Sequence, residues 1–507
     1  MAARRVILGV LLTLSLLWTQ DAANAASIKT YSNPVAVQLT DTSTSTLKLQ
    51  GFYELTNKAN NQKTFLLPNL TITITRAQGN VNIDAGSISF SSSSGFELKE
   101  VTNVKQYARF TSTTELKSGA TADYTTKKTF AKAETAEYIQ TFVNNKGETW
   151  YNVLAADGTK GWVSANSTLI DNYSISIPTL VYGSTSYRGG VSLLPKTSGK
   201  VAVMNNLDLE DYLKGVIPNE MPASWHKEAL KAQAIVARSY AANSMSLKNT
   251  TASQVYKGYS SEDSRTNQAV DETSGILVKH NGKPIQTFFY STSGGRTANV
   301  GDVWNSNQAS FPYLISVDDP YESSPHSNWE NSFTSSMILK SFGFDPSSTI
   351  LFDISINPTG ANGEVSSVTI DTSAGQKTIT GNEQTIRKLF PIEGSYGFLR
   401  SNWFTIKVNK DFAIQTTTGQ QSQLEVTGQQ VMTGSNTPVS ISSEKVSIQT
   451  SSGIVTKYSD PVSITATGKG WGHRIGMSQY GAKGFAEHNW KAIDIVKHYF
   501  PNTEVSK

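Results

Sequence analysis

The stretch that decides the fold of this chain runs from residue 209 to residue 225 and reads LEDYLKGVIPNEMPASW. One of its carboxylates, Glu220, lies between two prolines, with Trp225 five residues later. A carboxyl group in partly apolar surroundings has a raised pKa, because burial disfavours its charged form. Such a group can carry a proton near neutral pH and give it to a leaving oxygen. The alternative is an acid that only interacts with the dipole at the start of a helix.

The sequence on either side of Glu220 predicts a strand before it and a helix after it. Residues 201–205 are mostly apolar and predict a strand that leads into the turn. Residues 225–246 contain good helix formers and no glycine or proline, so they predict a long helix. Further along, we expect strands over residues 271–280 and 284–291, the second ending at Ser293-Gly294-Gly295.

The sequence of the N-terminal part predicts β structure. Strand-like alternation recurs over residues 26–130, most clearly at 35–39, 47–49 and 70–75. Residues 112–133 are rich in Lys and Thr and predict a solvated connector. It forms the end of an N-terminal β-rich region over 26–133 and leads into a module over 134–170. In that module, Asp157-Gly158 between aromatic strands predicts a hairpin. Trp150-Tyr151-Asn152-Val153 and Gly161-Trp162-Val163 resemble bacterial SH3-like wall modules, although the same letters suit any small hairpin.

The C-terminal part predicts more β structure and two helices. Residues 340–460 are mostly strand-like, with loops rich in Thr, Ser and Gln. After them come a glycine-rich turn and helices over 478–488 and 490–499. The fold class predicted for the whole chain is α+β, predominantly β, with a mixed domain built around the helix that follows Glu220.

Composition limits the kinds of protein that this chain can be. It has 507 residues, of which 38% are hydrophobic and 17% charged, and a net charge of +4. A charge this small for the length gives no case for a nucleic-acid partner, although a mildly cationic surface suits an anionic polymer such as a cell wall. There is no cysteine, which excludes thiol catalysis and thiolate metal sites.

The N-terminus predicts export. Arg4 and Arg5 precede an apolar run over residues 6–18, and Ala23-Asn24-Ala25 is a small-x-small cleavage pattern. We therefore expect a signal peptide over residues 1–25, cleaved after Ala25, and a protein of the bacterial cell envelope. The alternative is a retained anchor helix, but the run is shorter than the roughly 20 residues that span a bilayer.

Four sequence blocks resemble one family, the stage II sporulation protein D family with its amidase enhancer (autolysin modifier) members. In chain order they are residues 207–225, 228–240, 290–297 and 468–482, the last reading GKGWGHRIGMSQYGA. The resemblance covers about residues 180–505, with a β-rich insertion near 340–460.

The resemblance implies a lytic transglycosylase of peptidoglycan, associated with sporulation or wall remodelling. By this resemblance, Glu220 would be the catalytic acid that protonates the oxygen between N-acetylmuramic acid and N-acetylglucosamine. The same group then deprotonates the muramoyl C6 hydroxyl, which closes a 1,6-anhydro ring. One carboxyl group suffices, because the substrate supplies its own nucleophile, unlike the usual glycosidase with two.

Six further residues are candidates for substrate binding, each with a structural alternative. An arginine on the predicted helix could hold a substrate carboxylate or tie the helix to a loop. Aromatic rings could stack on sugar faces or pack in the core, and a histidine in a glycine-rich turn could line the groove or be structural. The candidates are Arg238, Gln233, Trp225, His473, Gln479 and Trp471.

The sequence departs from the family at one position. Some members carry a cysteine before the Gly-Gly of the third block and bind zinc through Cys and His. Here that residue is Ser293, and the six histidines show no paired metal spacing, so we predict neither a metal nor a cofactor.

Two alternatives to the enzyme remain open at this stage. One is a wall-binding modifier without catalytic activity that stimulates an N-acetylmuramoyl-L-alanine amidase, which makes a cell-wall amidase a possible partner beside the glycan strands. The other is an exported scaffold protein.

Overall fold

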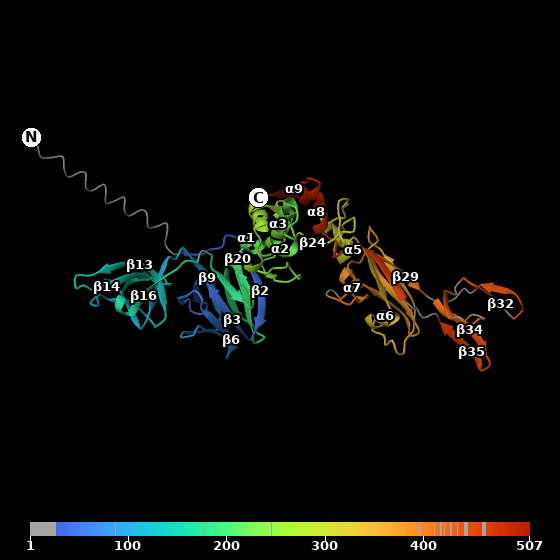
Figure 1. The fold of residues 1–507 in the computed structure, drawn as a ribbon, viewed down its shortest axis with the longest axis horizontal. Coiled ribbons are helices and arrows are strands. Elements are labelled where there is room, and N and C mark those ends of the chain that lie inside the picture. Colours follow the sequence, from blue (N-terminus) through green and yellow to red (C-terminus); the bar gives the residue numbers. More distant parts are fainter. Residues whose placement is uncertain are drawn as a thin grey trace, which may run out of the picture. The chain divides into compact units, whose positions relative to one another are not determined.

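The computed structural model describes residues 27–507 apart from residues 87, 176, 245, 395–396, 410, 416–417, 420, 426–427, 433, 441–444 and 459–462 (Figure 1). Strands predominate and helices gather in the middle and at the end of the sequence, which confirms the predicted α+β class. The predicted signal peptide lies outside the described residues. No described helix has the length and apolarity to span a bilayer.

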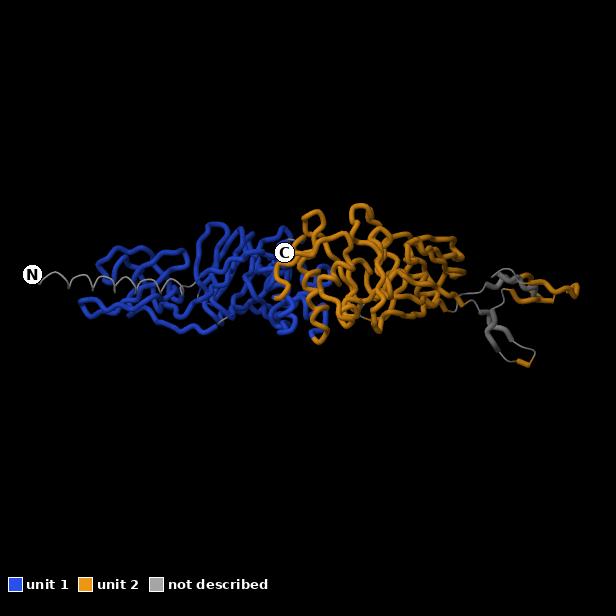
Figure 2. Tube along the Cα trace, turned by 90° about the horizontal axis from the view of Figure 1, so that it is seen from above, with its two compact units in different colours: residues 1–223, 244–271 blue, residues 224–243, 272–507 orange. Residues whose placement is uncertain are grey.

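The chain divides into two compact units, which Figure 2 colours separately. Unit 1 comprises residues 1–223 and 244–271, and unit 2 comprises residues 224–243 and 272–507. The domain predicted over 180–505 therefore contributes to both units. Glu220 belongs to unit 1, whereas the other six candidate residues belong to unit 2.

The largest sheet of unit 1 is antiparallel except for the pairing of β21 with β2. Its order is β21-β2-β20-β19-β9-β4-β5, with β1 beside β9. The bounds are β1 Ser27–Ile28, β2 Pro34–Thr42, β4 Phe52–Asn57, β5 Lys63–Leu66, β9 Phe96–Thr102, β19 Gly190–Pro195, β20 Val201–Asp208 and β21 Ser246–Lys248. The strands predicted at 35–39 and 201–205 are thereby confirmed.

A second sheet of unit 1 has the order β18-β17-β3-β6-β7-β8. In β6 the isoleucines are buried and the alternating threonines are not, as the alternation predicted. The bounds are β3 Thr44–Gln50, β6 Thr71–Ala77, β7 Asn80–Asp84, β8 Ser89–Ser92, β17 Thr179–Tyr182 and β18 Thr185–Tyr187.

A third sheet of unit 1, with seven strands, has the order β12-β11-β15-β14-β13-β10-β16 and its own apolar core around Phe110, Phe130 and Val153. The predicted hairpin at Asp157-Gly158 is confirmed, since β14 and β15 pair across it. The bounds are β10 Gln106–Phe110, β11 Thr114–Lys117, β12 Thr126–Phe130, β13 Thr135–Val143, β14 Thr149–Leu154, β15 Lys160–Ser164, η2 Ala165–Ser167 and β16 Thr168–Asn172.

The prediction of a solvated connector over 112–133 is wrong. This segment forms β11 and β12, which pair with each other, and β11 also pairs with β15. In β11, Thr114 and Leu116 are buried and Glu115 between them is exposed. Most of the Lys and Thr residues of β12 are exposed. The third sheet consequently begins near residue 106, well before the predicted module over 134–170.

Short helices follow the first sheet in unit 1. The helix α1 spans Leu209–Lys214, α2 spans Ile217–Glu220, η3 spans Tyr259–Ser261 and α4 spans Ser264–Glu272. The first turn of α2 contains Pro218, where the missing N–H of proline costs nothing.

Unit 2 contains the long helices predicted from the sequence, with slightly shorter bounds. They are α3 Lys227–Ala242, α8 Gln479–Glu487 and α9 Ala492–Tyr499, and α3 packs against both of the others. Small residues on α3, among them Ala234, Ala237 and Ala241, are fully buried and allow this close approach. Around them lie β22 Leu277–His280, β23 Lys283–Pro284, β24 Phe289–Tyr290, α5 Val300–Trp304, η4 Gln308–Ser310, β37 Met477–Ser478 and β38 Glu504–Ser506.

The prediction of strands over 271–280 and 284–291 is largely wrong. Residues 271–272 end the helix α4, and only Leu277–His280 is a strand. Between Pro284 and Ser291, only the ends pair: β23 with β22, and β24 in parallel with β37, nearly 190 residues later. A strand of two residues with so distant a partner leaves no pattern in the local sequence from which it could be predicted.

The remainder of unit 2 is β-rich, as predicted for 340–460. The sheets β25-β36-β29 and β26-β27-β28 and the helices α6 and α7 enclose one apolar core around Phe333, Phe390 and Phe404. Three further hairpins follow β29. The bounds are β25 Asn328–Phe333, α6 Ser335–Ser341, β26 Leu351–Pro358, β27 Val365–Thr372, β28 Gly375–Thr380, α7 Glu383–Lys388, β29 Phe404–Asn409, β30 Asp411–Gln415, β31 Gln421–Glu425, β32 Gln430–Met432, β33 Pro438–Ser440, β34 Lys445–Thr450, β35 Gly453–Tyr458 and β36 Ser463–Lys469.

Candidate functional site

Glu220 is the last residue of α2 and is partly buried. Its Oε1 accepts a hydrogen bond of 2.7 Å from the backbone N–H of Val255. Its own N–H donates to the carbonyl oxygen of Val216 at 3.1 Å. The carboxylate is therefore fixed by a second segment of unit 1 while keeping part of its surface open to solvent.

That second segment, residues 254–261, holds the α1–α2 turn in several places. The Tyr212 hydroxyl donates to the side-chain oxygen of Gln254 at 3.0 Å, and the N–H of Lys257 donates to the carbonyl of Gly215 at 3.1 Å. The amide of Asn219 donates to the Gly215 carbonyl and to the Ser261 hydroxyl, both at 2.9 Å. Glu220 is thus a positioned carboxyl group.

Sequence reasoning missed this supporting segment. A signal within it is Tyr256, one of two tyrosines in an otherwise mostly polar stretch. Its ring is fully buried, its hydroxyl donates to the side chain of Asn205 on β20 at 2.8 Å, and it lies so close to Gly215 that a side chain there would meet the ring at 2.6 Å.

The third and fourth sequence blocks come together in unit 2. The strands β24 and β37 pair in parallel, and Thr292 and Trp471 exchange backbone hydrogen bonds of 3.1 and 2.8 Å. We call residues 468–476 the Gly-rich turn. Its backbone has positive φ at Gly470, Gly472, Arg474 and Gly476, and three of these are glycine, which adopts this conformation without strain.

Arg474 is the residue around which the Gly-rich turn is built. Its side chain is fully buried and forms an ion pair of 2.9 Å with Glu364, which is also fully buried. It donates to the carbonyl oxygens of Ser293 at 2.9 Å and Arg296 at 2.8 Å, and its guanidinium lies 4.1 Å from the centre of the Trp403 ring. Sequence reasoning singled out the neighbouring histidine and missed this arginine.

His473 faces inward, toward a cage of aromatic rings. The ring centres of Trp304 and Tyr290 lie 5.0 and 5.3 Å from that of the imidazole. Burial lowers the pKa of His473 to about 3, aided by the charge of Arg387. Its Nδ1 accepts from the N–H of Ile475 at 3.1 Å, so this neutral histidine supports the turn, which favours the structural alternative.

Two candidates, both on α3, are buried. Arg238 is 1% exposed and contacts the carbonyls of Ala234 and Ile276 and the hydroxyl of Thr273, each at 3.4 Å, which favours the alternative of an arginine that ties helix to loop. Gln233 is fully buried, and its amide has no hydrogen-bond partner among the described residues.

The remaining candidates are, like His473, partly exposed. The ring of Trp225 meets Tyr480 edge-on at 4.9 Å, with the ammonium of Lys483 5.7 Å from its centre. Gln479 begins α8 beside Tyr480. Trp471 contacts His326 edge-on at 4.3 Å and keeps part of its surface in a shallow pocket. These three residues retain the exposure that contact with a ligand requires.

A carboxylate supports the turn at Ser293, the position where some members of the family carry a cysteine. Glu322 accepts hydrogen bonds from the backbone N–H groups of Ser293 and Gly294 and, at 2.7 Å, from the hydroxyl of Ser478. This gives the turn a local support that needs no thiolate. Within the part of the chain that the structure describes, no three His, Asp or Glu side chains converge as metal ligands.

A second buried carboxyl group, Asp319, lies near the same helices. It is 2% exposed, and neither of its oxygens has a hydrogen bond of ordinary geometry with a described residue. Burial raises the pKa of Asp319 to about 7, and the charge of Glu322 adds to the rise, which the nearby Tyr499, Ser293 and Ser478 hydroxyls moderate. Glycine at position 481 makes room for this arrangement, since a Cβ there would lie 2.0 Å from the Tyr499 oxygen and 2.2 Å from Asp319 Oδ2.

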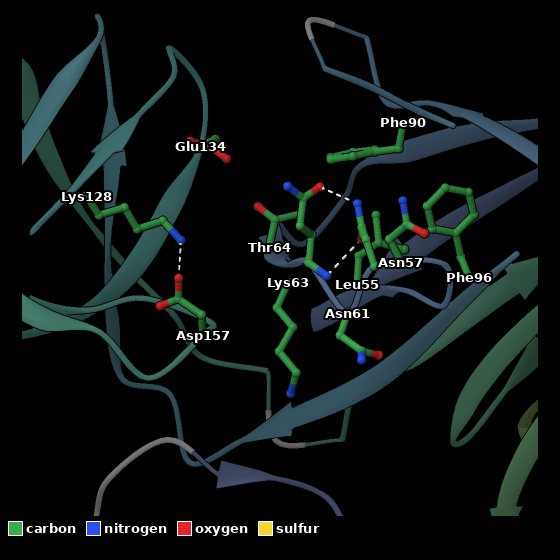
Figure 3. Close-up of a pocket in the computed structure, with 12 residues that line it drawn as sticks. Leu55, Asn57, Asn61, Lys63, Thr64, Phe90, Phe96, Lys128, Glu134 and Asp157 are labelled. Carbon is green, nitrogen blue, oxygen red and sulfur yellow. Dashed lines mark hydrogen bonds and ion pairs between the residues drawn. The ribbon is translucent and has the colours of Figure 1, made fainter. Parts of the chain in front are cut away.

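Unit 1 also has a polar cleft of about 500 Å³ away from the predicted residues. Figure 3 shows its lining, with the ion pair of Lys128 and Asp157 at 2.5 Å on one side and Asn57, Lys63 and Phe90 on the other. None of the seven predicted site residues lines it.

Comparison with known proteins supports the predicted resemblance. Residues 197–280, which contain Glu220 and α3, match the family model described as stage II sporulation protein. Over this segment the chain is similar to the stage II sporulation protein D and amidase enhancer family.

Family relatives match beyond those residues. The chain is 35% identical over 305 residues to the amidase enhancer of Bacillus subtilis, an alignment that covers 58% of this chain and 40% of that relative. It is 27% identical over 328 residues to stage II sporulation protein D of Bacillus subtilis, covering 60% of this chain and 76% of the relative. An uncharacterised protein of Brachyspira hyodysenteriae is 27% identical over 329 residues. The chain thus spans less than half the length of the amidase enhancer.

Proposed function

We propose that this chain is a secreted bacterial cell-wall protein and a lytic transglycosylase of peptidoglycan, with Glu220 as both acid and base. The observation that carries the proposal is the placement of Glu220. It is one partly exposed carboxyl group, fixed through Val255 at the end of α2, in the segment that matches the family model. Export is part of the proposal and rests on the predicted signal peptide.

The proposed reaction needs one carboxyl group and no water. The protonated Glu220 gives its proton to the glycosidic oxygen as the bond between that oxygen and the muramoyl anomeric carbon breaks. The carboxylate then takes the proton of the muramoyl C6 hydroxyl, whose oxygen bonds to the anomeric carbon. The carboxyl group returns to its protonated form, and the products are a free 4-hydroxyl end and a 1,6-anhydro end.

The hydrogen bond from Val255 fits this double role. It fixes the carboxyl group through one oxygen during both proton transfers, and a positioned group of this kind contributes about 10²–10⁴-fold to the rate. We therefore expect Glu220→Gln to lower the turnover of glycan strands by about this factor, because an amide cannot exchange the proton.

The experiment compares purified wild-type protein with Glu220→Gln on glycan strands stripped of their peptides. Glu115→Gln is the matched control: the same chemical change in the same unit, at a side chain 54% exposed. The proposal fails if Glu220→Gln, folded by circular dichroism, turns over the strands as fast as the control.

The second candidate function is a wall-binding modifier that stimulates an N-acetylmuramoyl-L-alanine amidase. It is favoured by the 35% identity to a relative named amidase enhancer. It predicts that wild type and Glu220→Gln both bind peptidoglycan, release no new sugar ends, and accelerate digestion by an added amidase equally.

A further inference from the structure

Unit 2 contains a pocket that joins the β-rich insertion to the Gly-rich turn. It has a volume of about 260 Å³ and is lined by Trp471 from the turn and by Ile392, Glu393, Phe398 and Arg400 from the segment before β29, with two glycines. We call it the Trp471 pocket. Pockets for drug-sized ligands begin at about 300 Å³, so this one suits a ligand of about one sugar ring.

The backbone on both sides of the pocket is fixed. The N–H of Gly472 donates to the carbonyl of Arg400 at 2.9 Å, and the Ser401 hydroxyl donates to the carbonyl of Lys469 at 2.6 Å. The N–H of Lys469 donates in turn to the carbonyl of Trp403 at 3.0 Å. The part of the pocket formed by Arg400 and Trp471 is therefore preformed, and binding to it would cost little ordering of the chain.

The pocket presents a cation whose charge is not neutralised. The Arg400 guanidinium lies 5.7 Å from the centre of the Trp471 ring and forms no ion pair with a described residue. The other arginines nearby are neutralised: Arg474 pairs with Glu364, and Arg387 pairs with Glu383. His326, which packs on Trp471, does not add charge near neutral pH, because burial and Arg400 both lower its pKa.

The chemistry of these groups defines a ligand with three features. An indole face stacks on the apolar face of a pyranose ring. A half-buried guanidinium binds a carboxylate through charge-assisted hydrogen bonds. Glu393, exposed at the rim, can accept a hydrogen bond from a hydroxyl or an acylamino N–H. A pyranose that carries both a carboxylate and an acylamino group satisfies all three.

We propose that the Trp471 pocket binds the carboxylate-bearing N-acyl sugar of the glycan strand, with its ring on Trp471 and its carboxylate on Arg400. The inference rests on the proposed function, because it names which part of that substrate is recognised and by which side chains. The proposal gives the β-rich insertion a role in selecting the sugar. Arg400 of the insertion would recognise the carboxylate, a group that does not take part in the reaction.

The test uses two sugars that differ in one group: N-acetylmuramic acid, which has a lactyl carboxylate, and N-acetylglucosamine, which does not. Their dissociation constants are measured by ligand-observed NMR titration against full-length Glu220→Gln protein, so that catalysis plays no part. We expect the acidic sugar to bind more tightly, and Arg400→Gln to weaken its binding about 10–100-fold without changing that of the neutral sugar. Trp471→Ala should weaken the binding of both.

Two further variants separate recognition from misfolding. Arg400→Lys keeps the charge, so it should retain part of the preference for the acidic sugar. Lys469→Gln removes a cation that lies over Trp403, at 5.1 Å, and should change neither constant. Equal binding of the two sugars to the parent protein, or unchanged binding of the acidic sugar to a folded Arg400→Gln variant, overturns the inference.

The outcome is independent of whether the chain is an enzyme. A protein that never cleaves glycan strands but prefers the acidic sugar through Arg400 refutes the transglycosylase and keeps the pocket. A protein that cleaves strands through Glu220, and whose binding of the acidic sugar is unchanged by the Arg400 substitution, keeps the transglycosylase and refutes the pocket.

Discussion

The buried carboxyl group of Asp319 predicts a specific dependence of stability on pH. Its pKa is raised from 3.8 to about 7 by burial, so the folded protein binds this proton more tightly than the unfolded chain does. The stabilisation is therefore fully present below pH 3.8 and is lost as the pH rises through about 7. The difference between the two pKa values corresponds to ~4 kcal/mol in total, of which ~2–3 kcal/mol is lost between pH 5 and pH 8.

Asp319→Asn removes the ionisable carboxyl group and keeps the shape of the side chain. The variant should therefore not lose stability in this way as the pH rises. Relative to wild type, its free energy of opening should rise by ~2–3 kcal/mol between pH 5 and pH 8. The assay is hydrogen exchange of peptides from α8 and α9, with variant and wild type compared at each pH so that the intrinsic exchange rate cancels.

Asp494→Asn, at an exposed position on α9, is the control and should show no such change. The other ionisable groups of the Asp319 cluster, Glu322, Tyr290 and Tyr499, remain in both proteins. The reasoning is refuted if the difference between Asp319→Asn and wild type is the same at pH 5 and pH 8, or if it falls.

Two further predictions concern the packing of unit 2. Gly481→Ala should destabilise the protein by about 1–3 kcal/mol, because its Cβ would overlap the Tyr499 and Asp319 oxygens; a lowered calorimetric transition shows this, while Gly434→Ala, with open space around its Cβ, should leave the transition unchanged. Glu364→Gln and Arg474→Met should each cost about 3–5 kcal/mol, since either leaves one charge buried without its partner. The double variant should cost less than the two single costs combined, and additive costs in urea denaturation would count against a coupled pair.

The helices and strands that the sequence predicted correctly depend on local patterns. The helix α3 has an uninterrupted run of helix formers, and β6 has strict alternation of isoleucine with threonine. The mispredicted strands lack such a pattern. The strands β11 and β12 pair locally but contain few apolar residues, and β24 forms only because the distant Met477 and Ser478 pair with it.

The same distinction holds for the candidate site. Glu220 is identifiable because the motif around it is contiguous, whereas its partner Val255 follows 35 residues later in a segment without a motif. Arg474 could be suspected from its place between glycines, but Glu364 lies 110 residues away, so no spacing connects them. His473 attracted attention as a titratable residue in a turn, and only the structure shows that the rings of Trp304 and Tyr290 pack around it.

The central claim is that one carboxyl group drives an attack within the sugar, without water. Mass spectrometry of the products formed from peptide-free glycan strands in heavy-oxygen water tests it most directly. The account predicts that wild-type protein releases 1,6-anhydro ends, lighter by one water than hydrolysed ends and free of the heavy isotope, and that Glu220→Gln releases almost none. Heavy oxygen at the new ends, or anhydro ends formed equally well by Glu220→Gln, would contradict it.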